Sequence, residues 1–248
     1  MKRETLERIR ADRAAKRPVA LATALESGAQ ALVHHDDVEG ALALDAETLA
    51  AVRQRLREDR SGTMPSPHGP LFVHAFNPPL RLVIVGAVHI AQSLVPMATL
   101  AGYEVTVIDP RRAFATDVRF PDVALIDDWP DEAMERLKPD GRTAVVTLTH
   151  DPKLDDPALQ VALRSPAFYI GALGSRKTHA ARCARLLAAG FTDAELARIH
   201  GPAGLDIGAR SPAEIAISVL AQITAARYGV LDAGARASAP AAATASAA

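Results

Sequence analysis

The chain has 248 residues, 49% of them hydrophobic, so it is long enough to bury the core of one large α/β domain or of a small and a medium domain. Its 28 Lys and Arg residues against 29 Asp and Glu residues give a formal net charge of -1 without any block of like charge, which excludes strong electrostatic attraction to nucleic acid or to an anionic membrane. The sequence has one cysteine, no apolar run long enough to span a bilayer, and a charged N-terminal stretch. These features predict a reduced, cytoplasmic protein. The balanced charge predicts small-molecule or protein partners.

Residues 1–78 predict a small α+β domain. Its expected elements are a helix over 4–16, strands over 18–26 and 29–35, a helix over 45–59 capped by Asp45, and a strand over 71–76. Ser27-Gly28 predicts a tight turn, and the Gly-, Pro- and Ser-rich residues 61–70 predict a loop. The stretch Asn77-Pro78-Pro79 places a domain boundary near residue 79.

Residues 79–230 predict a Rossmann-like, doubly wound parallel sheet, because near-continuous apolar strands alternate with helical patterns. The expected strands are 81–86, 103–109, 123–127, 143–149 and 168–173. Helices are expected from about His89, over 132–137, after Asp156-Pro157, and from Ser175, Thr192 and Ser211. Pro96 predicts a kink or a short first segment in the helix that contains it.

The C-terminal helices carry strong end signals. Thr192 with Glu195 and Ser211 with Glu214 are capping boxes, and Gly190 and Gly229 stand where helix C-terminal glycines belong. The last segment, residues 231–248, is composed mostly of Ala, Ser, Pro and Thr with little to bury, so we expect a disordered tail.

The strand-to-helix turn at Gly86 resembles a dinucleotide fingerprint with one change. Gly86 and Ala91 meet the needs of the turn and of helix packing, but Val88 replaces the second glycine and disfavours the ordinary pyrophosphate pose. Asp109 ends the next strand, where a carboxylate either meets ribose hydroxyls or only caps a turn. His89 is either a donor facing the crevice or a polar residue at a helix end.

Basic and polar residues follow the next strands. Arg111, Arg112 and Arg119 could hold phosphate, although surface salt bridging is the more common role of an arginine. His150 lies between Thr149 and Asp151 at a strand end, which favours a role in a ligand site. No second histidine or cysteine stands at metal-ligand spacing, so we expect no metal site.

The strongest anion-site signal is the stretch from Gly174 through Ser175 to Arg176 and Lys177. Two basic residues in the first turn of a helix oppose the helix dipole and cost stability unless an anion lies nearby. The alternative is a glycine turn with two solvated cations. Cys183 shares a helix face with His179 and is interpreted as a small core residue.

Six stretches together carry a family resemblance: VGAVHIA, VTVIDPRRAFA, RFP, TLTHDPKLDDPAL, YIGALGSRKT and GPAGLDIGARSPAEIAISVLAQI. From about residue 80 to 229 the chain resembles the xanthine dehydrogenase accessory protein family (XdhC/CoxI type), which includes the accessory proteins of carbon monoxide dehydrogenase clusters. Many members have Gly-Ala-Gly-His where this chain has Val88, and their N-terminal domain carries a Gly-Ser-x-Pro-Arg stretch and a Gly-Gly-Cys segment that are missing here.

The resemblance implies a chaperone without turnover of its own. Such a protein binds molybdenum cofactor (molybdopterin or its dinucleotide form), protects it during sulfuration by a cysteine desulfurase and delivers it to the apoenzyme of a molybdenum hydroxylase. A homodimer is compatible with this role. The expected cofactor-binding residues, with no catalytic or metal-ligating ones, are Gly86, Val88, His89, Asp109, Arg111, His150, Gly174, Ser175, Arg176 and Lys177.

Two other functions stay open. An NAD(P)-dependent oxidoreductase agrees with the fold and with Asp109, but Val88 and the lack of a Tyr-x-x-x-Lys pair weigh against it. A non-catalytic nucleotide-binding sensor would keep the crevice and act through contacts with other proteins.

Overall fold

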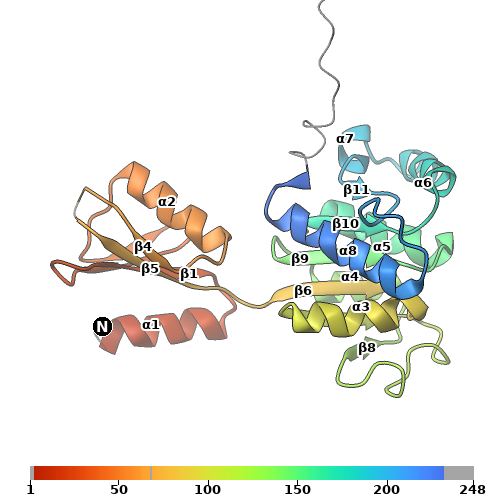
Figure 1. Ribbon diagram of the computed structural model, residues 1–248, viewed down its shortest axis with the longest axis horizontal. Coiled ribbons are helices and arrows are strands. Elements are labelled where there is room, and N and C mark those ends of the chain that lie inside the picture. Colours follow the sequence, from red (N-terminus) through yellow and green to blue (C-terminus); the bar gives the residue numbers. More distant parts are fainter. Residues whose placement is uncertain (1–2, 68, 232–248) are drawn as a thin grey trace, which may run out of the picture. The chain divides into compact units, whose positions relative to one another are not determined.

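The computed structural model describes residues 3–67 and 69–231, which form two compact units, with the boundary along the chain between Pro78 and Pro79 (Figure 1). The tail predicted to be disordered lies outside the described residues, apart from Leu231. None of the helices in the described ranges is both long enough and apolar enough to cross a membrane.

The N-terminal unit is an antiparallel sheet with one helix on each face. Its elements are α1 (Arg3–Ala14), β1 (Val19–Ala24), β2 (Gln30–Val33), β3 (Val38–Gly40), α2 (Ala46–Arg57), β4 (Gly62–Met64) and β5 (Leu71–Phe76). The strand order is β3-β2-β1-β5-β4. Ala20 and Ala22 of β1 pack with Val52 of α2, whereas Val19 and Leu21 share the second core with α1. The central strand is therefore buried on both faces.

Local signals account for most of this unit. Asp45 caps α2 as predicted, because its carboxylate accepts hydrogen bonds from the backbone N–H groups of Glu47 and Thr48. The short strands β3 and β4 were not predicted, and β4 lies inside the expected loop 61–70. Each has only three residues and no apolar alternation, so pairing with a neighbouring strand defines it rather than a pattern of its own.

The second unit is the predicted Rossmann-like domain. Its elements are β6 (Leu80–Val85), α3 (His89–Leu100), β7 (Tyr103–Ile108), β8 (Ala124–Ile126), α4 (Pro130–Leu137), β9 (Thr143–Thr147), α5 (Pro152–Arg164), β10 (Tyr169–Ala172), α6 (Arg176–Ala188), α7 (Asp193–Leu196), β11 (Ile199–His200) and α8 (Pro212–Arg227). The strands lie in the order β11-β10-β9-β6-β7-β8 and all pair in parallel. This is the doubly wound order in which the chain starts in the middle of the sheet and reverses direction once.

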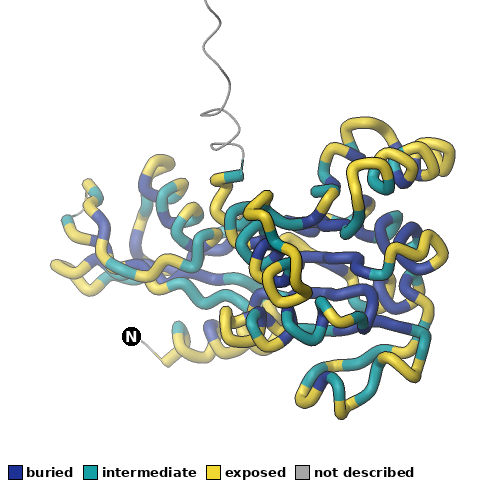
Figure 2. Tube along the Cα trace, turned by 45° about the vertical axis from the view of Figure 1, so that its right-hand side comes forward, coloured by how far each residue is buried: buried dark blue, intermediate teal, exposed yellow. Residues whose placement is uncertain are grey.

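Two separate cores cover the faces of this sheet. Leu82 and Ile84 of β6 pack with residues of α3 and α8, whereas Val83 and Val85 pack with α4, α5 and α6. Figure 2 shows the strands buried and the outer sides of the helices exposed. The near-continuous apolar strands in the sequence therefore reflect burial on both faces.

Helix boundaries follow the caps, with two corrections. The capping boxes at Thr192 and Ser211 are both formed, as predicted. The helix expected after Asp156-Pro157 begins earlier, at Pro152, with Asp151 as its cap. Pro157 removes one backbone hydrogen bond from the helix, and the loss of a single bond does not end it. Pro96 likewise lies inside one unbroken helix, α3, so of its two predicted effects, a kink or a short first segment, the second was wrong.

Candidate functional site

The crevice of a doubly wound sheet lies beyond the carboxyl ends of the strands where the strand order reverses, which here is between β6 and β9. All ten residues expected to bind the cofactor follow the carboxyl ends of four strands, β6, β7, β9 and β10. The fold therefore gathers them at one edge of the sheet, although it does not give them equal roles.

The loop from β6 to α3 comes close to the loop after β9. Gly86 has a φ of 112°, and a Cβ on it would lie 2.5 Å from the methyl carbon of Thr149. Only glycine fits this turn. Ala91 is fully buried, as helix packing requires. Val88 is the N-cap of α3 and forms no side-chain capping bond, while His89 is exposed as the first residue of the helix.

Asp109 holds the loop from β6 to α3 through a hydrogen bond to its backbone. Its side chain is fully buried and accepts hydrogen bonds from the backbone N–H of Ala87 at 2.8 Å and from Nε and Nη2 of Arg111 at 2.9 and 2.8 Å. Burial by itself raises the pKa of Asp109, but the hydrogen bonds from Arg111 and Ala87 outweigh it and hold the pKa below its usual value of 3.8. Asp109 therefore positions the crevice loop instead of offering a free carboxylate to a ribose.

Replacing Asp109 by asparagine should destabilise the protein by about 1–3 kcal/mol at neutral pH, because the variant loses its charge-assisted bonds in a buried place. Since the pKa of Asp109 is lowered in the folded protein, its contribution exists above pH 3.8 and is lost as the pH falls through the folded value. Urea unfolding at several pH values should show the difference between the two proteins shrinking below that pH. A difference that stays constant in acid would contradict the role assigned to Asp109.

The arginines after β7 are engaged within the protein. Arg111 binds Asp109 and lies over the ring of Phe114 at 4.7 Å. Arg112 pairs with Asp127 at 2.8 Å, and Arg119 donates to the carbonyl of Phe114 at 2.7 Å. These contacts agree with the alternative interpretation of the three arginines, in which they form contacts within the protein. They do not favour phosphate binding by these side chains.

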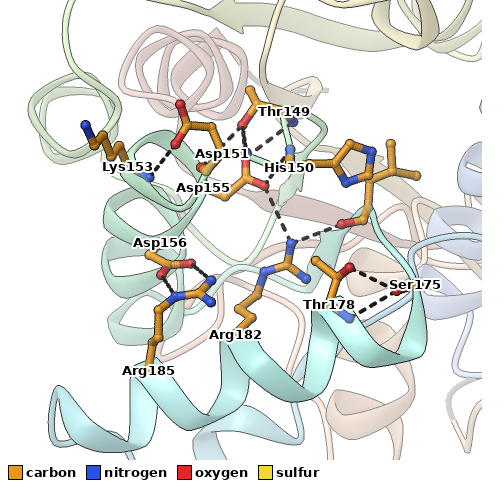
Figure 3. A network of polar contacts seen from close by, with 11 residues as sticks. Thr149, His150, Asp151, Lys153, Asp155, Asp156, Ser175, Thr178, Arg182 and Arg185 are labelled. Carbon is orange, nitrogen blue, oxygen red and sulfur yellow. Dashed lines mark hydrogen bonds and ion pairs between the residues drawn. The ribbon is translucent and has the colours of Figure 1, made fainter.

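Behind the loop after β9 lies a buried network that is organised by Asp155 (Figure 3). Its carboxylate accepts from the hydroxyl of Thr149 at 2.7 Å and from the backbone N–H of His150 at 3.1 Å. The backbone of His150 has a φ of 63°, a left-handed conformation, and its side chain is exposed at the crevice edge. Burial raises the pKa of Asp155, against the hydrogen bond from Thr149 and the charge of Arg182.

Arg182 supplies the charge opposite Asp155. It is 1% exposed, its Nη2 donates to the carbonyl of Leu173 at 3.0 Å, and the same nitrogen lies 3.5 Å from Asp155 Oδ2. Within the described ranges, Nε and Nη1 of Arg182 have no hydrogen-bond partner, and neither does the buried hydroxyl of Thr147 at the end of β9. Buried donors without partners are rare in folded proteins, and they are expected where a water or a ligand completes the structure.

The loop from β10 to α6 presents the predicted cations. Ser175 caps α6, accepting from the backbone N–H of Thr178 at 3.1 Å. A Cβ on Gly174 would lie 3.7 Å from Nδ1 of His150, so this loop and the one after β9 are neighbours. Arg176 and Lys177 are exposed in the first helical turn and form no ion pair with any residue that the structure describes. Two unpaired cations therefore face solvent at this helix N-terminus, as an anion site requires.

Cys183 lies beside His179 on α6, with Sγ 3.5 Å from Nε2. Burial, together with the charge of Arg182, lowers the pKa of His179 and so favours the neutral imidazole. A neutral histidine does not form an ion pair with a thiolate. Cys183 packs against the second core of the domain, in agreement with its interpretation as a small core residue.

Sequence reasoning missed Asp155, Arg182 and Thr147. Arg182 did leave a signal, because it stands four residues before the buried Leu186 and so shares the inward face of the helix. An arginine on a buried face needs a carboxylate partner, and the two aspartates at the start of α5 supply the candidates.

The strand order, the glycine turn after the first strand of the parallel sheet and the polar carboxyl edge define a Rossmann-fold protein. The family described as XdhC Rossmann domain matches residues 82–223, which is more than half of the chain. The protein belongs to the XdhC family, as its sequence motifs predicted.

Named relatives share the Rossmann part of the chain. The molybdenum cofactor insertion chaperone PaoD of Escherichia coli is 33% identical over 156 residues, which is 63% of this chain and 43% of PaoD. A protein of Bacillus subtilis named as a probable xanthine dehydrogenase component is 34% identical over 164 residues, which is 64% of this chain and 47% of that protein. The chain thus spans less than half the length of these relatives.

A solved structure extends the likeness to both units. The crystal structure of a xanthine dehydrogenase from Bacillus halodurans superposes with a TM-score of 0.69 at 26% identity, covering 95% of this chain and 70% of that one. The similarity in fold therefore includes the small N-terminal unit, where the family motifs are missing from the sequence.

Proposed function

We propose that this protein binds molybdenum cofactor, protects it during sulfuration by a cysteine desulfurase and delivers it to the apoenzyme of a molybdenum hydroxylase of the xanthine or carbon monoxide dehydrogenase type. It acts in the cytoplasm as a chaperone and has no turnover of its own. Membership in a family that contains an insertion chaperone supports this proposal. The observation that carries it in this chain is the crevice with cationic groups that lack partners among the described residues.

The residues fit an anionic, phosphate-bearing pterin. Arg176 and Lys177 would hold phosphate at the N-terminus of α6, and His150 and Ser175 stand beside them. The unpartnered nitrogens of Arg182 supply buried donors behind the same loops. When bound, the cofactor would supply the metal centre of the client enzyme, while the residues of this chain only hold and shield it.

Two features favour this ligand over NAD(P). Val88 caps α3 with an apolar side chain where a pyrophosphate needs bare backbone, and Asp109 has its carboxylate bonded to Ala87 and Arg111. A carboxylate that already holds the loop is not available to ribose hydroxyls. The domain keeps the nucleotide-binding fold. It lacks the two contacts by which that fold usually binds NAD(P), namely bare backbone for the pyrophosphate and a free carboxylate for the ribose.

The experiment is to purify the protein from cells that synthesise molybdenum cofactor and to assay molybdenum, released pterin and nicotinamide in the same sample. We expect molybdenum and pterin in equal amounts, with nicotinamide absent. The matched sample comes from cells that lack molybdopterin synthesis. Nicotinamide without pterin would overturn the proposal in favour of a dehydrogenase-like protein, and a sample with neither ligand that still captured a partner protein would favour a sensor.

A further inference from the structure

A histidine and two carboxylates converge in the N-terminal unit, outside the crevice. His34 follows β2, Asp37 lies in the turn, and Glu39 is in β3, so the hairpin brings all three together. One potential ligand atom from each residue lies within 4.8 Å of the other two. The side chain of His34 is only 2% exposed, whereas those of Asp37 and Glu39 are partly open to solvent.

One ring nitrogen of the buried His34, Nδ1, has no hydrogen-bond partner among the residues that the structure describes. Nε2 lies 2.9 Å from the buried carboxylate of Asp12, which belongs to α1. With the proton on Nε2 donated to Asp12, Nδ1 carries a lone pair. Nδ1 lies 3.1 Å from Oδ1 of Asp37 without the geometry of a hydrogen bond. Two acceptors at this distance repel each other unless a positive charge lies between them.

From this geometry we propose that His34, Asp37 and Glu39 bind a divalent transition-metal ion, with Zn²⁺ the best match. Imidazole nitrogen and carboxylate oxygen are both zinc ligands, and three such ligands leave a fourth position for water. A carboxylate that holds the far nitrogen of the ligand histidine, as Asp12 does, is the usual support of such a site. In a tetrahedral site with zinc bonds of about 2.0–2.2 Å the ligand atoms lie roughly 3.4 Å apart. The widest pair, at up to 4.8 Å, must therefore move closer by roughly 1.4 Å, through side-chain rotation of the partly exposed Asp37 and Glu39.

An ion can reach the site through its two carboxylates, because the side chains of Asp37 and Glu39 are 44% and 42% exposed. Glu39 also lines a surface pocket of about 330 Å³, which His34 and Asp37 do not line. The sequence predicts no metal site because no second histidine or cysteine stands at ligand spacing, whereas this set contains a single histidine with oxygen ligands.

Two arginines now neutralise the carboxylates. Arg17 donates to Asp37 Oδ1 at 2.8 Å, and Arg8 donates to Glu39 Oε1 at 2.6 Å. Both guanidinium groups are more than 40% exposed and can turn into solvent when an ion binds. Because these cations compete with a metal ion, removing Arg17 should tighten metal binding, whereas removing Asp37 should abolish it.

The test uses tag-free, chelator-treated full-length protein titrated with Co²⁺ as a spectroscopic substitute for Zn²⁺. We expect one Co²⁺ per chain with visible d–d absorption, displaced by Zn²⁺, and a rise in melting temperature with Zn²⁺. Asp37→Asn and His34→Gln should lose the absorption, and Arg17→Gln should lower the dissociation constant at least threefold. The exposed neighbouring pair supplies the control, since His35→Gln with Asp36→Asn should bind like the unaltered protein.

Several results would overturn the proposal. These are the absence of stoichiometric Co²⁺ binding, absorption that survives Asp37→Asn, or loss of absorption in the control variant. If His34→Gln does not fold, the partly exposed Asp37 variant decides the matter. Nitrogen NMR that finds protons on both ring nitrogens of His34, unchanged by Zn²⁺, would assign the cluster to a buried imidazolium ion pair. None of these readouts depends on molybdenum cofactor.

Discussion

Replacing Arg176 and Lys177 together by alanine is expected to weaken binding of inorganic pyrophosphate by roughly 10- to 100-fold, because two charge-assisted contacts are lost at one helix end. The same change should leave the protein folded and should raise its stability by about 0.3–1 kcal/mol per residue, since cations in a first turn oppose the helix dipole. Isothermal titration and urea unfolding measure the two effects.

The opposite signs of these effects make the prediction specific. A merely solvated pair of cations would give the gain in stability without any change in affinity, and that result would remove the anion site. Arg10→Ala with Arg13→Ala is the matched control, because both residues are exposed on α1 and their loss changes the net charge equally. Pyrophosphate affinity should be the same in this control as in the unaltered protein.

Replacing Arg182 by methionine should destabilise the protein by roughly 3–5 kcal/mol, because it strands the carboxylate of Asp155 in the interior. Both side chains are 1% exposed, so water cannot solvate the remaining charge. Denaturant unfolding followed by fluorescence and circular dichroism measures the loss. The control is Arg185→Met, because Arg185 is 42% exposed and its partner Asp156 is 12% exposed, so water can reach the remaining charge and the loss should be smaller than for Arg182→Met.

A second variant distinguishes the effect of the Arg182–Asp155 charge pair from the effect of the packing around Arg182. Arg182→Met combined with Asp155→Asn should be more stable than Arg182→Met alone, since no charge is left unpaired. If the double variant is as unstable as the sum of both single changes, Arg182 stabilises the protein through its packing and its bond to Leu173, and the charge pair is not the cause.

The sequence predicted what depends on local pattern or on buried strands. The sheet of the Rossmann unit followed from apolar strands, and the caps at Asp45, Thr192 and Ser211 followed from residues adjacent to the helices that they begin. The predicted start of α5 is five residues too late, because Asp151-Pro152 begins the helix and Asp156-Pro157 lies inside it. Prediction was weakest for the three-residue strands, which exist only through their neighbours.

The candidate site shows the same division. The sequence placed the ten residues at strand ends, and the fold brought those ends to one edge. It could not show that Asp109 is bonded to Ala87, or that Arg182 meets Asp155 across 27 residues of chain, because those contacts depend on how loops and helices pack. The cluster around His34 was not predicted for the same reason, because the partner of its imidazole, Asp12, belongs to a different element, α1.

The two ion pairs between α5 and α6 have a consequence for binding itself. Asp155 meets Arg182 and Asp156 meets Arg185, so two consecutive acids on one helix face two arginines one turn apart on the other (Figure 3). This double connection fixes the register of the helices against sliding. The loops that carry His150 and Ser175 stand at the ends of these same helices, so their spacing is set before any ligand arrives. Binding of a ligand at this edge therefore carries little free-energy cost for ordering the loops, and the ordering of these loops should contribute little to the entropy change of binding.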